Sequence, residues 1–411
     1  MVDCWLPYGE TEVYVSVEME QLLGIAEPKN VAPEKPGSEI LLEAFSNPVG
    51  KNLEELLTQE TTVAIAVDNY ASPHAVVLTL RELVRTLVEL IIPRDRLTII
   101  LGNGENDKNK SKLRAAIENT SDLKNITIID HNNNTSNLVD VGTTHRGTPV
   151  KVNSQYHAAS LKIAIGETRV DQYTGFSGAH SAVIPGIASA ATIIENRKHY
   201  IDGDITPAVI ELNPVKEDIL EAVKAAGIDF AVNLVTNMEG RIVSAYTGGF
   251  EETWGRAING LSGHYEANVS ENADITIVSA GGIPHDQSMY SASMAVKTAS
   301  GVTKKNGTII LLAECGSGLG AEAYTQLAKV TEKTEFKRRY MKGAEALQEV
   351  KQVQKNQRII LVSALPAYLV ESVGMESART ANEAYKRAVQ SRRGRRTTVI
   401  PRGITTTISR L

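Results

Sequence analysis

The sequence predicts an α/β protein: two α/β domains with mostly parallel sheets flanked by helices, and a ligand cleft between them. From about Thr61 onward, short apolar runs alternate with segments whose apolar residues recur at helical spacing. This alternation is typical of strand–helix–strand units, in which helices cover both faces of a parallel sheet. A chain of 411 residues is too long for one ordinary hydrophobic core, so two domains are expected.

Composition and charge narrow the classes of function. Hydrophobic residues make up 42% of the chain and charged residues 22%, which is typical of a soluble globular protein. A net charge of −5 argues against nucleic acid as the main partner. There is no apolar run of the ~18 residues that a membrane span needs, and no secretory signal at the start. Cys4 and Cys315, the only cysteines, lie too far apart for a disulfide framework. We therefore expect a cytoplasmic protein with a small-molecule partner, and no nucleic-acid or membrane partner.

The predicted elements fall into two runs, separated by a weaker pattern around residues 200–270. The first run has strands at 61–70, 96–104, 125–133 and 159–168, and helices at 75–90 and 111–119. Residues 229–249 predict a hairpin around Asn237–Gly240. The second run has strands at 273–282, 307–320, 357–366 and 397–403, and helices at 288–301, 321–330 and 376–390. We place the domain boundary near 250–272, dividing the chain into 1–258 and 259–411.

The segment from Asp171 to Gly186 is a glycine-rich stretch that follows the strand predicted at 159–168. Gly175 and Gly178 could bring backbone N–H groups close to an anion, with Ser177 between them. The same glycines also suit a tight strand-to-helix turn without any ligand. Spacing alone does not separate these interpretations, because glycine-rich turns are unspecific.

Other polar groups follow the predicted strands, where open α/β sheets bind their ligands. Asp68 ends the first strand and stays open as a site residue. Ser72 with Pro73 is better explained as a helix N-cap. Asp286, after the 273–282 strand, could act with His285 at a site or could itself cap the helix that follows.

Residues 141–153 contain a hydroxyl and guanidinium cluster, Thr143 to Arg146, that suits an anionic substrate. An exposed hairpin turn through Arg146 and Gly147 is the simpler explanation when the segment is taken alone. Residues 315–320 are too loose for a dinucleotide fingerprint, and the basic run 391–396 is best explained as a solvated loop.

Six motifs in this order are more specific than any one of them. They are LPYG, VGTTHRGTPVKVN, LKIAIGE, GFSGAHSAVIPGIASAATIIEN, VSAGGIPHDQSMY and IILLAECGSGLG. Their combination resembles the nickel-dependent lactate racemase family across nearly the whole chain. The resemblance implies two α/β domains with a cleft, and racemisation or epimerisation of a 2-hydroxy acid. It also implies a nickel pincer nucleotide that takes a hydride from the substrate carbon and returns it, two histidines as acid and base, a lysine tether and a histidine ligand to nickel.

This sequence departs from the family pattern at most of those positions. The family's D-x-T-R-x-T-P loop is here Asp68 to Pro73, with the aspartate kept and the arginine replaced by Ala71. Gly104 and Asp171 stand where the family has its two catalytic histidines, Ser181 stands in place of the lysine, and Arg197 stands in place of the nickel-binding histidine. In the C-terminal part, Tyr290 matches the family, whereas Ser291 and Met294 replace a glutamine and a lysine. Serine cannot form the lysine's covalent link, and a permanently charged guanidinium is a poor ligand for a divalent metal.

Two functional hypotheses follow. The first is a divergent racemase or epimerase, with the nickel pincer nucleotide as its implied cofactor. The second is a paralogue that binds a small anionic ligand without nickel. The candidate catalytic residues are Asp68, Asp171 and Tyr290; the candidate cofactor-binding residues are Gly175, Ser177, Gly178, Ser181, Thr144 and Arg146. At the metal position Arg197 replaces the family ligand, and His180 and His199 are considered as shifted ligands against the simpler explanation that both are surface histidines. A homodimer is left open.

Overall fold

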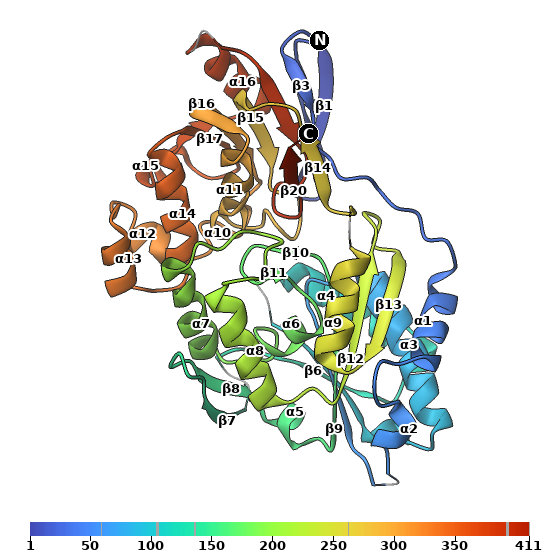
Figure 1. Cartoon of the computed structure of the whole chain (residues 1–411). Helices are drawn as coiled ribbons and strands as arrows, with labels where there is room; N and C mark the ends of the chain where they lie inside the picture. Colours follow the sequence, from blue (N-terminus) through green and yellow to red (C-terminus); the bar gives the residue numbers. More distant parts are fainter. Residues whose placement is uncertain (59, 104–106, 135–136, 262, 392–393, 411) are drawn as a thin grey trace. The chain divides into compact units, whose positions relative to one another are not determined.

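The computed structural model (Figure 1) describes residues 1–58, 60–103, 107–134, 137–261, 263–391 and 394–410. The chain forms two compact units. The larger unit comprises 30–199 and 203–264, and the smaller unit comprises 1–29, 200–202 and 265–411. The division into 1–258 and 259–411 placed residues 1–29 in the first domain, whereas here they belong with the C-terminal residues.

The larger unit is built on a six-stranded sheet of order β13-β12-β9-β4-β5-β6. All neighbouring pairs are parallel except β12 with β13, which form the predicted hairpin. The strands are β4 (Val63–Val67), β5 (Leu97–Leu101), β6 (Thr127–Asp130), β9 (Leu161–Glu167), β12 (Phe230–Thr236) and β13 (Ile242–Gly248). Two small hairpins accompany the sheet, β7 (Leu138–Thr143) with β8 (Pro149–Asn153) and β10 (Val170–Asp171) with β11 (Gly175–Phe176).

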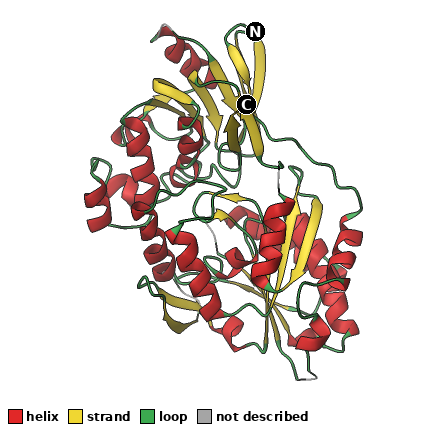
Figure 2. Cartoon of the chain, viewed as in Figure 1, coloured by secondary structure: helices red, strands yellow, loops and turns green. Residues whose placement is uncertain are grey.

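Helices cover this sheet, as the colours in Figure 2 show. They are α1 (Gly37–Ser46), α2 (Leu53–Leu56), α3 (Pro73–Glu89), α4 (Asp107–Glu118), α5 (Ser154–Ala158), α6 (Ala179–Val183), α7 (Ala190–Asp202), α8 (Pro214–Ala226) and α9 (Phe250–Gly260), with 3-10 turns at Arg94–Arg96 and Ser121–Leu123. The predicted cap of α3 is confirmed, because the Ser72 side chain accepts a hydrogen bond from the N–H of Ala75 and Pro73 follows it.

The two faces of the central strands differ in side-chain size. Val63 and Ile65 of β4 share a hydrophobic core with Leu80 and Leu83 of α3. Alternate strand residues point to the opposite face, where β4 has only Ala64 and Ala66, and a Cβ on Gly166 of β9 would lie 2.2 Å from the carbonyl oxygen of Gly178. The small residues therefore let the segment that leads into α6 approach the sheet closely.

The smaller unit contains a second six-stranded sheet, of order β18-β17-β16-β15-β19-β3, with every pair parallel. Its strands are β3 (Leu22–Ile25), β15 (Ala273–Ser279), β16 (Thr303–Leu312), β17 (Arg358–Val362), β18 (Glu376–Ala378) and β19 (Thr397–Ile400), beside the pairs β1 (Val2–Tyr8) with β2 (Thr11–Val17) and β14 (Glu266–Val269) with β20 (Thr407–Arg410). Its helices are α10 (Met289–Ser293), α11 (Ala295–Ser300), α12 (Ala323–Gln326), α13 (Lys333–Arg338), α14 (Ala344–Gln354), α15 (Ala367–Ser372) and α16 (Ala381–Gln390).

The predicted fold class is confirmed by these two parallel-rich, helix-covered sheets, but several element predictions were wrong in detail. Residues 376–378 form β18 rather than the start of a helix, and Thr380 caps α16. The helix expected over 321–330 is only α12, and the strand expected to reach 320 ends at Leu312. Within the described part of the chain, no helix combines the length and the apolar character that a membrane crossing requires.

Candidate functional site

The order of the strands marks one edge of the larger sheet as the place for a ligand. From β4 the chain proceeds to β5 and β6 on one side, and it then returns to β9 and continues to β12 on the other. The connections after the adjacent strands β4 and β9 therefore leave in opposite directions. Open α/β sheets bind their ligands at the carboxyl ends of strands at such a point. The loops after Val67 and Glu167 form this edge.

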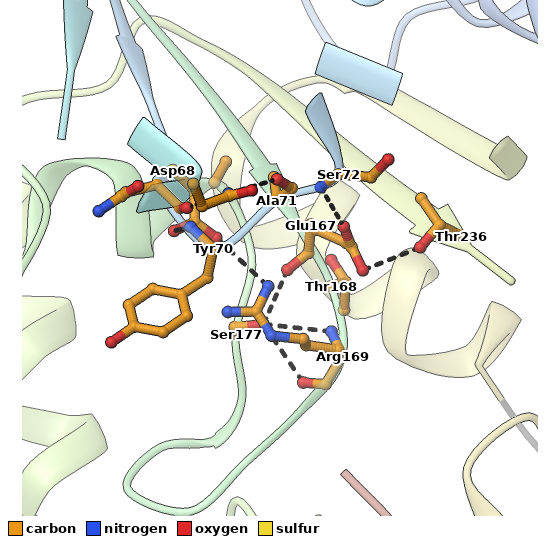
Figure 3. A network of polar contacts seen from close by, with 12 residues as sticks. Asp68, Tyr70, Ala71, Ser72, Glu167, Thr168, Arg169, Ser177 and Thr236 are labelled. Carbon is orange, nitrogen blue, oxygen red and sulfur yellow. Dashed lines mark hydrogen bonds and ion pairs between the residues drawn. The ribbon is translucent and has the colours of Figure 1, made fainter. Parts of the chain in front are cut away.

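The loop after β4 holds Asp68 in a fixed position. Asp68 is only 4% exposed, and its N–H donates to the carbonyl of Ile165 in β9 at 3.0 Å. Its Oδ1 accepts the N–H of Tyr70 at 3.0 Å, so the side chain folds back on its own loop (Figure 3). The carboxylate predicted from the strand end is thus buried at the edge of the sheet where the connections after β4 and β9 diverge.

Arg169, which sequence reasoning missed, is the ionic partner of Asp68. Its Nη1 lies 3.5 Å from Asp68 Oδ2, and only 12% of its side chain is exposed. Its guanidinium also lies 5.5 Å from the ring centroid of Tyr70. Burial raises the pKa of Asp68, and the attraction of Arg169 only partly opposes that rise. The sequence signal was a charged residue two positions beyond a largely buried strand.

Glu167 ties the two loops together. One carboxylate oxygen accepts the N–H of Ser72 at 2.9 Å, and the other accepts the hydroxyl of Thr236 at 2.8 Å. The Ser177 hydroxyl donates to the Glu167 carbonyl at 2.7 Å. Figure 3 shows Ser72, Thr236 and Ser177 meeting around Glu167. Ser177, predicted to bind a cofactor, therefore uses its hydroxyl to close the loop.

Asp171 lies at the start of the glycine-rich segment and is held in the charged form. Its Oδ1 accepts the N–H groups of Tyr173 and Thr174 and the Thr174 hydroxyl, at 2.9, 2.7 and 2.8 Å. Burial by itself would raise the pKa of Asp171, but the charge of Arg197 and these donors together hold the pKa below its ordinary value. The Arg197 guanidinium lies 3.5 Å from the ring centroid of Tyr173.

The pKa values of the two buried aspartates are therefore shifted in opposite directions, upward for Asp68 and downward for Asp171. Environments that separate two carboxylates in this way are a common property of sites that hold or move a proton. Asp171 is also one of the charges that raise the pKa of Asp68, so the two groups interact electrostatically.

The glycines of this segment serve packing and turn geometry. Gly175 has φ of +82° at the turn of the β10–β11 hairpin, and a Cβ on Gly178 would lie 2.7 Å from Trp254. The N–H groups of Ser177 and Ala179 donate to the Arg169 carbonyl and the Asn233 side chain, at 2.9 and 2.8 Å. These donors are used within the protein, which favours the tight-turn interpretation over an anion cradle.

His180 is buried, so the explanation that it is a surface histidine was wrong. It is 0% exposed, and its ring lies 4.9 Å from Trp254 and 5.9 Å from Phe250, measured between centroids. Burial lowers the pKa of His180 to about 4. Among the residues that the structure describes, neither ring nitrogen has a hydrogen-bond partner. The next residue, Ser181, lies in the short helix α6.

The hydroxyl and guanidinium cluster forms the expected hairpin turn, and its contacts are with α8. Thr144 donates to Asp218 at 2.5 Å, and Arg146 pairs with Glu217 at 2.6 Å. His199 lies 3.8 Å from Asp218, with 19% of its side chain exposed. Thr144, Arg146 and His199, three of the predicted site residues, therefore lie beside α8.

Tyr290 lies in the smaller unit, where its hydroxyl donates to Glu345 at 2.8 Å. Tyr340 donates to the other oxygen of Glu345 at the same distance, so a fully buried carboxylate orients both phenols. The alternative that Asp286 caps the following helix was wrong: Ser288 is the cap, and Asp286 instead accepts the N–H of Gly9 at 2.6 Å.

Within the described ranges, there is no group of three or more histidine, cysteine, aspartate or glutamate residues that could hold a metal ion. Gly104, aligned with the first catalytic histidine, lies outside the described residues.

Comparison with known proteins decides the family. A model of the lactate racemase N-terminal domain matches residues 8–206, and a model of the lactate racemase C-terminal domain matches residues 269–408. The chain belongs to the lactate racemase family. It is 27% identical over 333 residues to the lactate racemase of Thermoanaerobacterium thermosaccharolyticum, covering 79% of this chain and 77% of the relative. It is 25% identical over 426 residues to that of Lactiplantibacillus plantarum, covering 98% and 99%.

Solved structures agree on the fold of this lactate racemase family member. The lactate racemase apoprotein from T. thermosaccharolyticum superposes with a TM-score of 0.84 at 24% identity, covering 99% of this chain and all of that one. A protein from Thermotoga maritima superposes with a TM-score of 0.66 at 16% identity, covering 94% of this chain.

Proposed function

We propose that this lactate racemase family member binds a small anionic 2-hydroxy acid at the carboxyl ends of β4 and β9, without the nickel pincer nucleotide. The observation that carries this proposal is the setting of Arg197. Its guanidinium is stacked on Tyr173 and holds the pKa of Asp171 down, at the position where the family pattern has its nickel ligand.

The residues present do not fit the family's cofactor. Ser181 has no amine with which to form the covalent link that a lysine makes. Arg197 cannot give up its proton, so its nitrogens offer no lone pair to a metal. We therefore derive no chemical step through the nickel nucleotide in this chain.

Arginine suits a carboxylate ligand, because its planar donors match the two oxygens. The site holds Arg169 and Arg197, each beside an aspartate. An added anion would repel Asp68, whose pKa is already raised by burial. Binding should therefore be coupled to protonation of Asp68, which frees Arg169 to turn toward the ligand.

This coupling has a definite sign. The anion favours the protonated form of Asp68, so affinity should be highest at low pH and should fall as the pH rises through the folded-state pKa of that carboxyl. Calorimetric titration in buffers of different ionisation enthalpy should then show proton uptake on binding.

A nickel-dependent racemase is the second candidate, and His180 favours it. A neutral imidazole is the form that binds metals, and the low pKa of His180 keeps it neutral at physiological pH. The family membership itself also supports racemisation as the reaction to test.

One experiment separates the candidates. The chain is produced together with the enzymes that make the nickel nucleotide, and its metal content and intact mass are measured. Its thermal stabilisation by lactate and other 2-hydroxy acids is recorded in parallel. We expect no stoichiometric nickel, an unmodified mass and stabilisation by a 2-hydroxy acid.

Two variants show whether that stabilisation arises at the proposed site. Arg197→Met should abolish it, whereas Arg81→Met, which alters an exposed ion pair with Asp122, should leave it unchanged. Stoichiometric nickel together with lactate racemisation would overturn the proposal in favour of the second candidate.

A further inference from the structure

We infer that Asn69 hydrogen-bonds the hydroxyl group of the bound acid and thereby determines specificity for 2-hydroxy acids over simple carboxylates. This inference rests on the proposed function and deepens it. It is carried by the side chain of Asn69, which lies in the loop after β4, between Asp68 and Tyr70.

The amide of Asn69 is buried but is not used within the described protein. The residue is 3% exposed. Among the described residues, neither its Oδ1 nor its Nδ2 has a hydrogen-bond partner. Most buried side-chain polar groups in folded proteins have a partner, and leaving one without a partner destabilises the fold. A buried amide with both its donor and its acceptor unused therefore points to a group that arrives from outside the chain.

The loop that carries Asn69 is fixed on several sides. The Asn109 side chain donates to the carbonyls of Asn69 and Ala71, at 2.5 and 3.2 Å. The N–H of Tyr70 is held by Asp68, and Ser72 is held by Glu167. These bonds fix much of the loop backbone, whereas the Asn69 amide has no hydrogen-bond partner among the described residues.

The chemistry of the amide matches the hydroxyl of the proposed ligand. An amide offers a donor and an acceptor in fixed directions, and a hydroxyl is also both a donor and an acceptor. A 2-hydroxy acid carries its hydroxyl on the carbon next to the carboxylate. Asp68, the residue before Asn69, is the ionic partner of Arg169, so a carboxylate held by Arg169 brings that hydroxyl to the same loop.

The test compares lactate with propanoate, which lacks only the hydroxyl. Dissociation constants are measured by calorimetry for the wild-type chain and for Asn69→Leu, which has nearly the same size and no polar group. We expect the wild type to prefer lactate by about tenfold or more. Asn69→Leu should lose this preference, while its affinity for propanoate should stay within about twofold of the wild type.

Thermal unfolding shows whether the variant itself is sound. Removing an unsatisfied buried amide should leave the unfolding temperature of Asn69→Leu equal to or above that of the wild type. Asn233→Leu is the matched control: its amide is fully buried and binds Thr253 and the N–H of Ala179, so its loss should lower the unfolding temperature. If Asn69→Leu does not fold, Asn69→Ala removes the amide without adding bulk and should lose the same preference.

The outcomes are distinct. Equal preference for lactate in the wild type and in the Asn69 variants would overturn the inference and leave the proposed function standing. A folded Asn69→Leu with a clearly lower unfolding temperature would also overturn it, because the amide would then be satisfied within the protein, for example by a buried water. If the wild type binds neither acid, the proposed function fails, and the inference fails with it.

Discussion

Replacing Arg169 by methionine tests whether the buried Asp68 carboxylate depends on its guanidinium. The side chain of Arg169 is 12% exposed and that of Asp68 is 5% exposed, with 3.5 Å between Nη1 and Oδ2. Removing one partner of a buried ion pair costs about 3–5 kcal/mol, because a buried charge is left uncompensated. We expect about 2–3 kcal/mol here, since the ion pair is long and Asp68 keeps its bond from the N–H of Tyr70.

The cost should depend on pH in a direction fixed by the pKa of Asp68. Its folded-state pKa lies above the unfolded value. A carboxyl shifted in this way favours the folded state most at a pH below its unfolded pKa, and that contribution is lost as the pH rises through the folded pKa. Without Arg169 the folded pKa rises further. Arg169→Met should therefore destabilise the protein more at pH 7.5 than at pH 5.

The assay is urea unfolding followed by tryptophan fluorescence in a Trp5→Phe background. The chain has two tryptophans, and Trp254, in the larger unit, is 6% exposed, so it reports on that unit. Arg169→Met should cost less than about 1 kcal/mol when Asp68 is already asparagine, because no charge is then left behind. Arg146→Met is the exposed control, expected to change stability by at most about 1 kcal/mol. An equal loss in both backgrounds and at both pH values would refute the coupling.

Three further predictions concern other buried residues. Gly178→Ala should destabilise the larger unit by about 1–3 kcal/mol by overpacking, whereas Gly255→Ala, whose Cβ would meet nothing within 4 Å, should be neutral or stabilising in the same unfolding assay. The wild type should lose about 3 kcal/mol of stability between pH 6.5 and 4, because the folded-state pKa of His180 is about 4 and the unfolded state therefore binds the proton at a higher pH. His180→Phe should abolish this loss, and an unchanged pH profile would contradict the prediction. Glu345→Gln should leave a single acceptor for the two phenols that it binds and lower the unfolding temperature, and an unchanged unfolding temperature would show that the carboxylate does not orient them.

Local signals explain why much of the fold could be predicted. The strand β4 is apolar throughout because both of its faces are buried, and such a run is recognisable without any neighbour. The cap at Ser72 and Pro73 and the hairpin of β12 and β13 likewise depend on residues close together in sequence. The errors at 321–330 and 376–390 arose where short elements carry too few residues for a clear period.

The candidate site depends on contacts between residues that are far apart in sequence. Arg169 and Asp68 are 101 positions apart, and they meet only because β4 and β9 are neighbours in the sheet. The sequence left His180 open between a shifted metal ligand and a surface histidine, and it is buried because α9 brings Phe250 and Trp254 against it.

By itself, the sequence determined the α/β class, most strands of the two sheets and, through its motifs, the lactate racemase family. Only the tertiary structure decided which polar groups are buried together, which are paired, and which have no partner among the described residues. The reason is physical: periodicity reports which face of an element is apolar, whereas the pKa values of Asp68 and Asp171 depend on burial and on charges brought from distant positions.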